Sequence, residues 1–519
     1  MPKRPPYADV HLDVAPGEER SPQAPDAETP FSIVILGDFT GRANRGRVET
    51  GKALASRAPL LIDRDNFDAV LQKLSPQLAL PLGGEGGLKL ALEFKDLEDF
   101  HPDRLFEKAV LFRKLREVRK RLENPDTFRE TAAELGLAAE PSREPQRPQP
   151  PRRIDAEDVQ RITSGSLLDE MIESTEQRAS AAPTRAPDEW ALLVNKIVAP
   201  HLVARADPRQ AELLGLIDRA TGAQMRALLH AEAFQQLEAA WRALFLLVRN
   251  LETSSQLKLY LLDVSKQELA ADLGASENLS STATYKVLAE KTAGTLGAEP
   301  WTLIVGNFTF DPTREDAGLL RRLARVSAAA GAPFVAGASP RFIGCDSVQK
   351  LSEPESWRSL PGEAQESWQA LRGSPEAEFL GLLLPRFLLR LPYGKETEAT
   401  ELFQFEETSD PADHEEYLWG NPAFACALLL GQTFAEQGWA MHPGSHSDVS
   451  GLPFYTYKAQ GESKTLPCAE ILMTVSAAER ILEKGFMPLA SLKDQTAVRL
   501  VRFQSVADPL APLAGRWEA

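Results

Sequence analysis

Two histidines have the spacing most suggestive of a metal site. His442 and His446 lie four residues apart, a separation that places two imidazoles on one face of a helix. Pro443 and Gly444 stand between them, however, and proline interrupts a regular helix. We therefore expect this segment to be an ordinary loop, and we predict no metal ligand in it.

The other patterns that could carry chemistry are incomplete. The glycines at 83–87 are not followed by the Lys-Ser/Thr of a phosphate-binding loop, and no Gly-x-Ser-x-Gly elbow occurs near His446. Adjacent acids at 98–99, 406–407 and 415–416 are candidate acids and bases, but we interpret them as charged surface or as partners of arginine. We predict no catalytic centre and no cofactor.

Two arginines inside an apolar run are the most informative charged residues. Residues 384–394 read LPRFLLRLPYG and place Arg386 and Arg390 between two prolines. A buried charge without a partner is very costly, so each arginine requires a carboxylate or carbonyl groups. A second unusual string, EYLWGNPA at 416–423, contains Trp419 and Asn421. The acidic residues between or at these strings are Glu406, Glu407, Asp413, Glu415 and Glu416. We expect a packed core in which Arg386, Arg390, Trp419 and Asn421 have structural roles.

Length and composition limit the class of protein. A chain of 519 residues exceeds one ordinary core, and 43% hydrophobic with 25% charged residues is typical of a soluble globular protein. The formal net charge of -16 disfavours nucleic acid as the main partner. No apolar run is long enough to cross a bilayer, the first residues lack a secretory signal, and three cysteines are few. We expect a cytoplasmic protein that binds neither membrane nor nucleic acid.

The hydrophobic pattern predicts strands that alternate with helices. Residues 7–14 alternate apolar and polar side chains, and residues 31–39 are typical of a buried strand that ends in a polar turn. Segments 78–82 and 88–94 flank glycines and predict a hairpin. Helices are expected at 102–123, over 188–250, and at 265–273, 281–296 and 314–331, with strands at 257–264, 301–310 and 333–338. This order predicts a mixed α/β protein with a parallel-type core.

Changes in composition divide the chain. A stretch rich in proline, glutamate and alanine follows the first strand, and a second Pro-rich stretch begins near residue 138. We predict an N-terminal strand and extended arm (1–29), a first domain (30–137), a Pro-rich linker (138–163), a short helix with its linker (164–187) and a second domain (188–519).

Several strings resemble one family. Those in the first domain are 34–42, 62–71 and 94–103, and those in the second are 167–170, 234–242, 262–266, 384–394, 417–421, 451–453 and 485–489. On these strings residues 7–137 resemble the small subunit of the type VI secretion contractile sheath, and residues 164–506 resemble its large subunit. The chain thus resembles a natural fusion of both. The resemblance implies the contractile-sheath fold, built from two intertwined subunit-like halves.

The resemblance also implies partners and interaction residues. In that family, paired subunits stack into a contractile tube around an inner tube, and neighbours share a β-sheet to which extended arms contribute. Val10, Leu12 and Val14 would belong to such a donated strand. A short helix near the start of the large subunit is recognised by the AAA+ ATPase that disassembles contracted sheaths. Leu167, Leu168, Met171 and Ile172 match that helix, which alternatively packs on its own domain.

One departure from the family shapes our expectation of function. The large subunit continues beyond the string that matches 504–506 and there supplies strands to the shared sheet, whereas this sequence ends at Ala519. We therefore expect a truncated sheath-like component that joins or caps the sheath or baseplate, or regulates its assembly. The alternatives are an ordinary polymerising protomer in one chain and an enzyme that reuses the fold.

Overall fold

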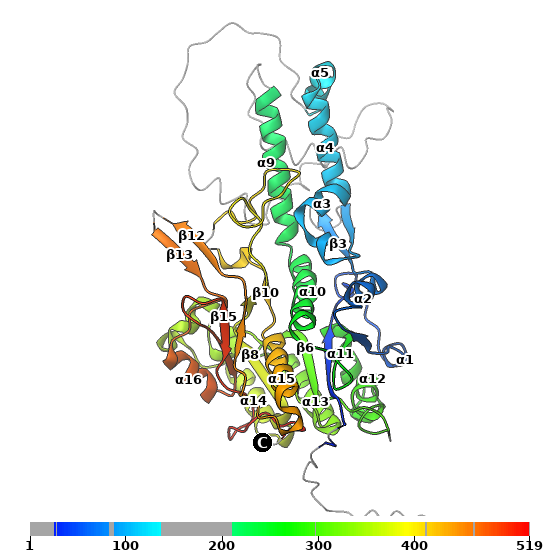
Figure 1. The fold of residues 1–519 in the computed structure, drawn as a ribbon, viewed down its shortest axis with the longest axis vertical. Coiled ribbons are helices and arrows are strands. Elements are labelled where there is room, and N and C mark those ends of the chain that lie inside the picture. The colour runs from blue at the N-terminus through cyan, green and yellow to red at the C-terminus, as the bar shows by residue number, and fades with distance from the viewer. Residues whose placement is uncertain are drawn as a thin grey trace, which may run out of the picture.

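The structure of the chain is a computed structural model. It describes residues 25–26, 28–82, 88–135, 210–295, 297–410, 413–459 and 462–517. We call the described residues from 30 to 135 the N-terminal half and those from 210 to 517 the C-terminal half. The two halves are packed into one body, with the main sheet at one end and a group of helices at the other (Figure 1).

A nine-stranded mixed sheet forms the base of the molecule. Its order is β11 (Asp448–Ser450), β15 (Ala497–Leu500), β14 (Met487–Ser491), β8 (Leu380–Leu384), β7 (Phe334–Ala338), β6 (Leu303–Phe310), β1 (Phe31–Gly37), β5 (Leu257–Asp263) and β2 (Leu60–Ile62). The neighbours from β14 to β5 pair in parallel, and antiparallel strands lie at both edges. The parallel α/β core expected from the sequence is confirmed.

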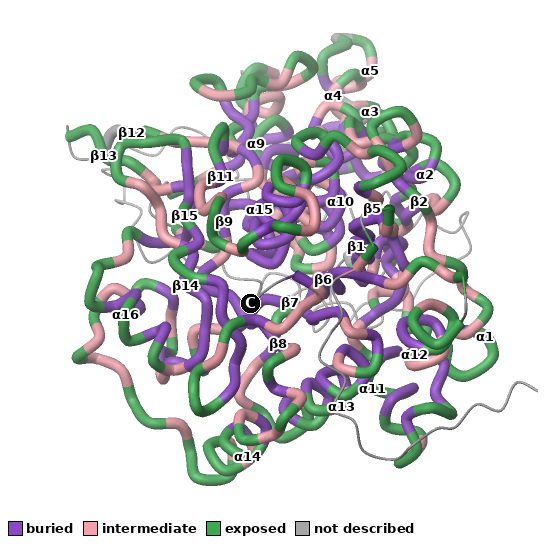
Figure 2. Tube along the Cα trace, turned by 60° about the horizontal axis from the view of Figure 1, so that its bottom comes forward, coloured by how far each residue is buried: buried purple, intermediate pink, exposed green. Residues whose placement is uncertain are grey.

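Helices cover both faces of this sheet, so its central strands are buried on both sides. In β1, Ile33 and Ile35 join the hydrophobic cluster on one face, whereas Val34 and Leu36 join the cluster on the other. Buried residues run through the middle strands, and exposed residues lie in the outer loops and helices (Figure 2). The continuous apolar run of β1 is thus explained by its central position.

The two faces carry different helices. One is covered by α1 (Lys52–Ala55), α11 (Lys266–Gly274), α12 (Ala283–Tyr285), α13 (Arg314–Ala330), α14 (Gly362–Arg372) and α16 (Val475–Glu483). The other packs against α10 (Glu232–Asn250) and α15 (Ala423–Gln437). The core of this second face continues into α2 (Phe67–Leu74), α3 (Pro102–Lys108), α4 (Val110–Glu123), α5 (Pro125–Glu134) and α9 (Gln210–Leu229).

Three small two-stranded sheets complete the described fold. They are β3 (Gln77–Leu82) with β4 (Leu88–Glu93), β9 (Phe387–Leu388) with β10 (Trp419–Gly420), and β12 (Tyr455–Ala459) with β13 (Glu462–Leu466). The first is the predicted hairpin, with antiparallel pairing from Gln77 to Leu82. The β12–β13 hairpin projects from the body (Figure 1).

Two predicted helices are interrupted. The helix expected over 102–123 divides at Ala109, whose extended backbone ends α3 and begins α4. The helix expected over 281–296 is wrong in its extent, because α12 has three residues and passes into a π-helical turn over Lys286–Glu290. Hydrophobic spacing continues across both breaks, so the sequence pattern alone does not reveal them.

Candidate functional site

The contact between the two halves is the candidate site, because strand pairing, ion pairs and aromatic packing all connect the halves there. Strand β1 of the N-terminal half lies between β5 and β6 of the C-terminal half and runs parallel to both. Its register pairs Phe31 with Leu257 and continues to Gly37 with Asp263. We call this contact, with the polar groups described next, the sheet joint. Separating the halves here requires breaking two ladders of backbone hydrogen bonds.

The turn after β1 is held by a carboxylate from the other half. The N–H groups of Phe39 and Thr40 donate to Asp263 Oδ1 over 2.8 and 3.1 Å, and Thr40 Oγ1 donates to Oδ2 over 2.8 Å. Burial raises the pKa of Asp263 to about 6, although the hydrogen bond from Thr40 opposes that shift. Asp263 therefore fixes the direction in which the N-terminal half leaves the sheet.

A second carboxylate collects donors from a longer segment of the N-terminal half. Glu268 accepts from Arg57 Nη2 over 2.6 Å, from Arg42 Nε over 3.2 Å and from the N–H of Glu49 over 2.9 Å. Its side chain is fully buried. Burial disfavours the ionised form, but the hydrogen bond from Arg57 helps to lower the pKa of Glu268 to about 2. The residue stays charged and joins separate parts of the N-terminal half to α11.

The position of Glu268 follows from a local motif. Ser265 and Glu268 form a capping box at the start of α11, in which each side chain accepts from the other residue's N–H. This motif holds the carboxylate rigidly beside the two arginines. Our sequence reasoning did not single out Glu268, although a serine followed three residues later by glutamate is a recognisable signal.

An aromatic contact adds to the sheet joint. Trp241 of α10 is fully buried and donates through Nε1 to the carbonyl of Phe39 over 2.9 Å. Its ring meets Phe39 and Phe67 edge-on, with centroid separations of 5.4 and 5.8 Å. A large apolar surface and a directed hydrogen bond thus connect the halves through one side chain.

The halves also meet at the other end of the molecule, where α4 packs on α9. Arg119 Nε donates to Asp218 Oδ1 over 2.8 Å, and Gln210 Nε2 donates to the carbonyl of Leu122 over 2.9 Å. Arg119 and Asp218 are 39% and 52% exposed. We call this contact the helix joint, and its charged groups remain largely in water.

The apolar run at 384–394 contains a buried ion-pair network. Arg390 donates to Glu407 over 2.7 and 2.9 Å and to Glu238 of α10 over 2.7 Å. It also lies 4.2 Å from the centre of the Tyr393 ring. Burial opposes the charge, but the two carboxylates hold the pKa of Arg390 well above its ordinary value. Glu407 was among the expected partners, whereas Glu238 was not.

The partner of Arg386 differs from the expected acids. Arg386 donates through its N–H and its Nε to Glu470 over 2.7 and 2.9 Å. His414 contacts the same carboxylate over 2.6 Å. Burial disfavours the protonated imidazole, yet its contacts with Glu415 and Glu470 raise the pKa of His414 to about 9. The expectation of a nearby acid was wrong because Glu470 lies 84 residues further along the chain.

Trp419 and Asn421 connect this region to the main sheet. Trp419 pairs with Leu388 between β10 and β9, and its Nε1 donates to the carbonyl of His414 over 2.9 Å. Asn421 Nδ2 donates to the carbonyl of Phe308 in β6 over 2.9 Å, and its Oδ1 accepts from the N–H of Ala423. Asn421 therefore connects the start of α15 to β6.

Comparison with known proteins identifies the family. The VipB tail-sheath N-terminal domain matches residues 211–507, and VipA of the type VI secretion system matches residues 3–133. The chain belongs to the type VI secretion sheath family. Sheath protein TssC1 of Pseudomonas aeruginosa is 34% identical over 352 residues, which cover 66% of this chain and 70% of TssC1. Sheath protein TssB1 of that organism is 35% identical over 105 residues, or 20% of this chain and 59% of TssB1. This sheath-family chain is a TssB/TssC-like fusion.

Several interaction residues expected in this sheath protein lie outside the described residues. They are Val10, Leu12 and Val14 of the N-terminal arm, and Leu167, Leu168, Met171 and Ile172 of the short helix. Their roles stay predictions.

The groups considered for chemistry have other contacts in the sheath fold. His446 Nε2 lies 2.9 Å from Glu436, and the N–H of His442 donates to Gln437. Within the described ranges, no group of three His, Cys, Asp or Glu residues is arranged to hold a metal ion. Burial raises the pKa of Cys345 and Cys468 to about 11, which disfavours reactive thiolates.

Proposed function

We propose that this chain is a mechanical component of the type VI secretion sheath in which one polypeptide replaces a pair of subunits. The position of β1 between β5 and β6 supports this proposal, because a strand of the VipA-like half completes the sheet of the VipB-like half. The covalent link then fixes one small half to one large half. In this proposal other sheath subunits are the first partners, and the protein works in the cytoplasm.

The proposed role is structural, with no enzymatic reaction. The ionisable groups buried in the two networks are engaged in ion pairs: Glu268 with Arg57, and Arg390 with Glu238 and Glu407. Groups arranged in this way stabilise a fold, and their shifted pKa values have a structural cause. The named relatives are sheath proteins, which agrees with this role. Among the described helices, none has the length and apolar character needed to cross a membrane.

Within the sheath we propose that the chain joins or caps the sheath or baseplate, or regulates sheath assembly. The short edge strands of the main sheet support this proposal. The edge strands β2 and β11 have three residues each, so the sheet has little capacity to accept a further strand. Short edge strands offer few free backbone groups to a neighbouring strand. The inner tube and the AAA+ disassembly ATPase remain further proposed partners, the latter through residues 166–173.

One observation favours the alternative of a polymerising protomer. The β12–β13 hairpin pairs only with itself among the described strands, and the residues of β13 from Glu462 to Thr465 are exposed. An exposed two-stranded hairpin gains stability when a third strand is added. This hairpin is therefore a second candidate surface for contacts between copies.

Electron microscopy of the purified full chain distinguishes the two roles. For an end-joining or regulating component we expect no long tubes from the chain alone, and recovery of the tagged chain with separate sheath subunits or baseplate proteins from its native cell. Long tubes formed by the chain alone would instead establish the polymerising protomer. If tubes form, Thr465→Pro tests the hairpin and Thr465→Val serves as its control, since only proline removes a backbone donor. Recovery without any sheath or baseplate protein would overturn both roles.

A further inference from the structure

His230 lies at the corner where the chain turns from α9 into α10. Its N–H donates to the carbonyl of Arg226 over 2.9 Å, and the extended backbone of Ala231 precedes α10. The two helices follow one another along the long axis of the molecule (Figure 1). Since α9 carries the helix joint and α10 carries Trp241 of the sheet joint, a change at His230 acts between the two joints.

One nitrogen of the His230 ring is buried without a hydrogen bond. Nε2 is shielded from solvent and has no hydrogen-bond partner within the described part of the chain. A carboxylate oxygen of Glu407 lies 3.9 Å from Nε2, which is beyond hydrogen-bond distance. Because buried polar atoms in folded proteins are nearly always bonded, Nε2 is an exception that needs an explanation.

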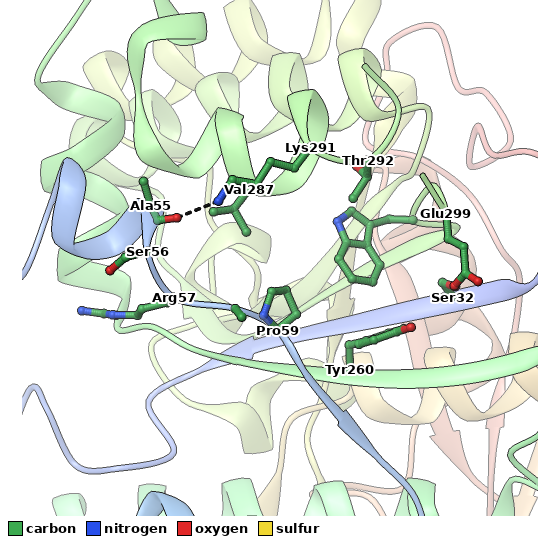
Figure 3. A pocket seen from close by; sticks show the side chains of 12 residues that line it. Ser32, Ala55, Ser56, Arg57, Pro59, Tyr260, Val287, Lys291, Thr292 and Glu299 are labelled. Carbon is green, nitrogen blue, oxygen red and sulfur yellow. Dashed lines mark hydrogen bonds between the residues drawn. The ribbon is translucent and has the colours of Figure 1, made fainter. Parts of the chain in front are cut away.

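A cavity between the two halves, shown in Figure 3, gives a contrast. Each charged side chain that lines it is paired: Lys291 with the carbonyl of Ala55, Glu299 with Lys258, and Arg57 with Glu268. The dashed line in Figure 3 marks the first of these bonds, over 2.8 Å. A titratable group with an unmet hydrogen bond thus lies at the corner of α9 and α10 and not at this cavity.

Charged groups from three segments act on the His230 ring. Glu407 and Glu416 lie after the apolar run, Arg390 lies within it, and Arg226 lies in α9. Burial is the largest influence and lowers the pKa of His230, and the two arginines act in the same direction. The two glutamates oppose this shift but do not reverse it. The folded protein therefore favours the neutral ring.

Glu407 is poorly placed to stabilise a protonated His230. Its two carboxylate oxygens already accept from Arg390 over 2.9 and 2.7 Å, and one of them also accepts from the N–H of Tyr393 over 2.7 Å. Arg390 in turn binds Glu238 of α10 over 2.7 Å. A proton on Nε2 would make the ring compete with Arg390 for Glu407, and it would weaken the network that connects Glu407 to α10.

Further bonds attach the segment 405–416 to the corner. Arg226 Nη1 donates to the carbonyl of Glu406 over 3.1 Å, and Gln235 Nε2 donates to the carbonyl of Glu415 over 3.3 Å. Both bonds are exposed to solvent, so each stabilises the contact only modestly. The buried network is therefore the stronger polar attachment of this segment to the two helices.

We propose that His230 is a proton-sensitive switch for the segment 405–416. The neutral ring lets this segment lie against the corner of α9 and α10, and the protonated ring loosens the segment by drawing Glu407 away from Arg390. Because the folded protein favours the neutral ring, the contact is intact above the ordinary histidine pKa of about 6.5 and weakens as the pH falls below it. This inference goes beyond the proposed sheath role and does not depend on assembly.

Nuclear magnetic resonance of the full chain, labelled with nitrogen-15 in histidine, tests the first step. The sequence contains seven histidines, and the ring signal that disappears in His230→Gln or His230→Asn is that of His230. We expect this ring to titrate below the ordinary histidine pKa of about 6.5. A midpoint at or above that value would overturn the proposal.

Hydrogen–deuterium exchange at pH 7.5 and 5.5, corrected for the intrinsic effect of pH, tests the second step. We expect acid to lower the protection of the segment 405–416 several-fold, and about tenfold is the most that one histidine supplies one pH unit below its ordinary pKa. His230→Gln and His230→Asn should remove this loss. His442→Gln, which changes an exposed histidine, should retain it. No loss in the wild type, or an equal loss in His230→Gln, would overturn the proposal.

Other titrating groups are separated by the same design. His414 lies within the segment, but its pKa of about 9 keeps it protonated at both pH values. Asp263 has a pKa of about 6, but it lies at the sheet joint and is unchanged in every variant. A loss of protection that disappears only in the His230 variants is therefore due to His230.

Discussion

The sheet joint and the helix joint connect the same two halves by different means. At the sheet joint, β1 is paired on both sides and Glu268 is fully buried among arginines. At the helix joint, the connecting ion pair is Arg119 with Asp218, and both side chains are substantially exposed. Buried pairing depends on geometry and resists salt, whereas exposed ion pairs contribute little. The comparison indicates that the sheet joint contributes most to holding the halves together and that the ion pair of the helix joint contributes little.

The largest expected effect comes from the packing of β1. Ile35 is fully buried, and Ile35→Ala should lower the free energy of unfolding by about 4 kcal/mol because it leaves a cavity in the central strand. Urea denaturation followed by circular dichroism measures the loss. Leu61→Ala in the edge strand β2 is the control, since Leu61 is 48% exposed. Equal losses in both variants would remove the distinction between central and edge strands.

The next effect comes from the carboxylate of the sheet joint. Glu268→Gln should destabilise the protein by about 3 kcal/mol, because Arg42 and Arg57 then lose their buried negative partner and share only the exposed Glu49. The same denaturation measurement applies. Glu277→Gln replaces an exposed glutamate on the same half and should change stability by less than about 0.5 kcal/mol. A loss below about 1 kcal/mol for Glu268→Gln would mean that the network contributes little.

A third effect depends on pH. The pKa of Asp263 in the folded state is about 6, above its ordinary value, so protonation favours the folded protein. Its stabilising contribution is complete below about pH 4 and is lost as the pH rises through 6, by about 3 kcal/mol. Asp263→Asn should remove this slope while keeping an acceptor for Thr40.

The pH range in which stability changes distinguishes Asp263 from Glu268 and His414, whose pKa values are also shifted. Glu268 has a lowered pKa of about 2, so its contribution is present above its ordinary pKa and is lost as the pH falls through 2. His414 has a raised pKa of about 9, so its contribution is lost at higher pH. Stability curves of the wild type and Asp263→Asn between pH 4.5 and 6.5 compare the two slopes, and parallel curves would contradict the prediction.

The smallest effect is expected at the helix joint. Asp218→Asn should lower stability by less than about 1 kcal/mol, since the pair with Arg119 is exposed. The difference from the wild type should disappear in 1 M salt, which screens exposed charges. A loss as large as that of Glu268→Gln would reverse the comparison between the two joints.

Local sequence patterns predicted much of the fold, but they did not predict which strands and ion-pair partners far apart in the sequence come together. The apolar run of β1, the β3–β4 hairpin and the alternation of strands with helices follow from hydrophobic pattern. The insertion of β1 between β5 and β6 does not follow from hydrophobic pattern, because that pattern carries no information on strand order. For the same reason nearby acids were expected for Arg386, while Glu470 is its partner.

The need for ion pairs was predictable, but the identity of the partners was only partly so. An arginine in an apolar run predicts a nearby carboxylate because its charge needs a partner when buried. Glu407 was among the candidate partners of Arg390. Glu238 lies 152 residues earlier, within the otherwise apolar face of α10. A lone glutamate in such a face is the signal that could have identified it.

The position of β1 also has a consequence for synthesis. This strand leaves the ribosome early, yet its neighbour β6 begins only at Leu303. At translation rates of roughly 5–20 residues per second, the nascent apolar segment remains without its second neighbour for tens of seconds. During that interval its apolar side chains lack their native contacts, which makes the nascent chain prone to aggregation.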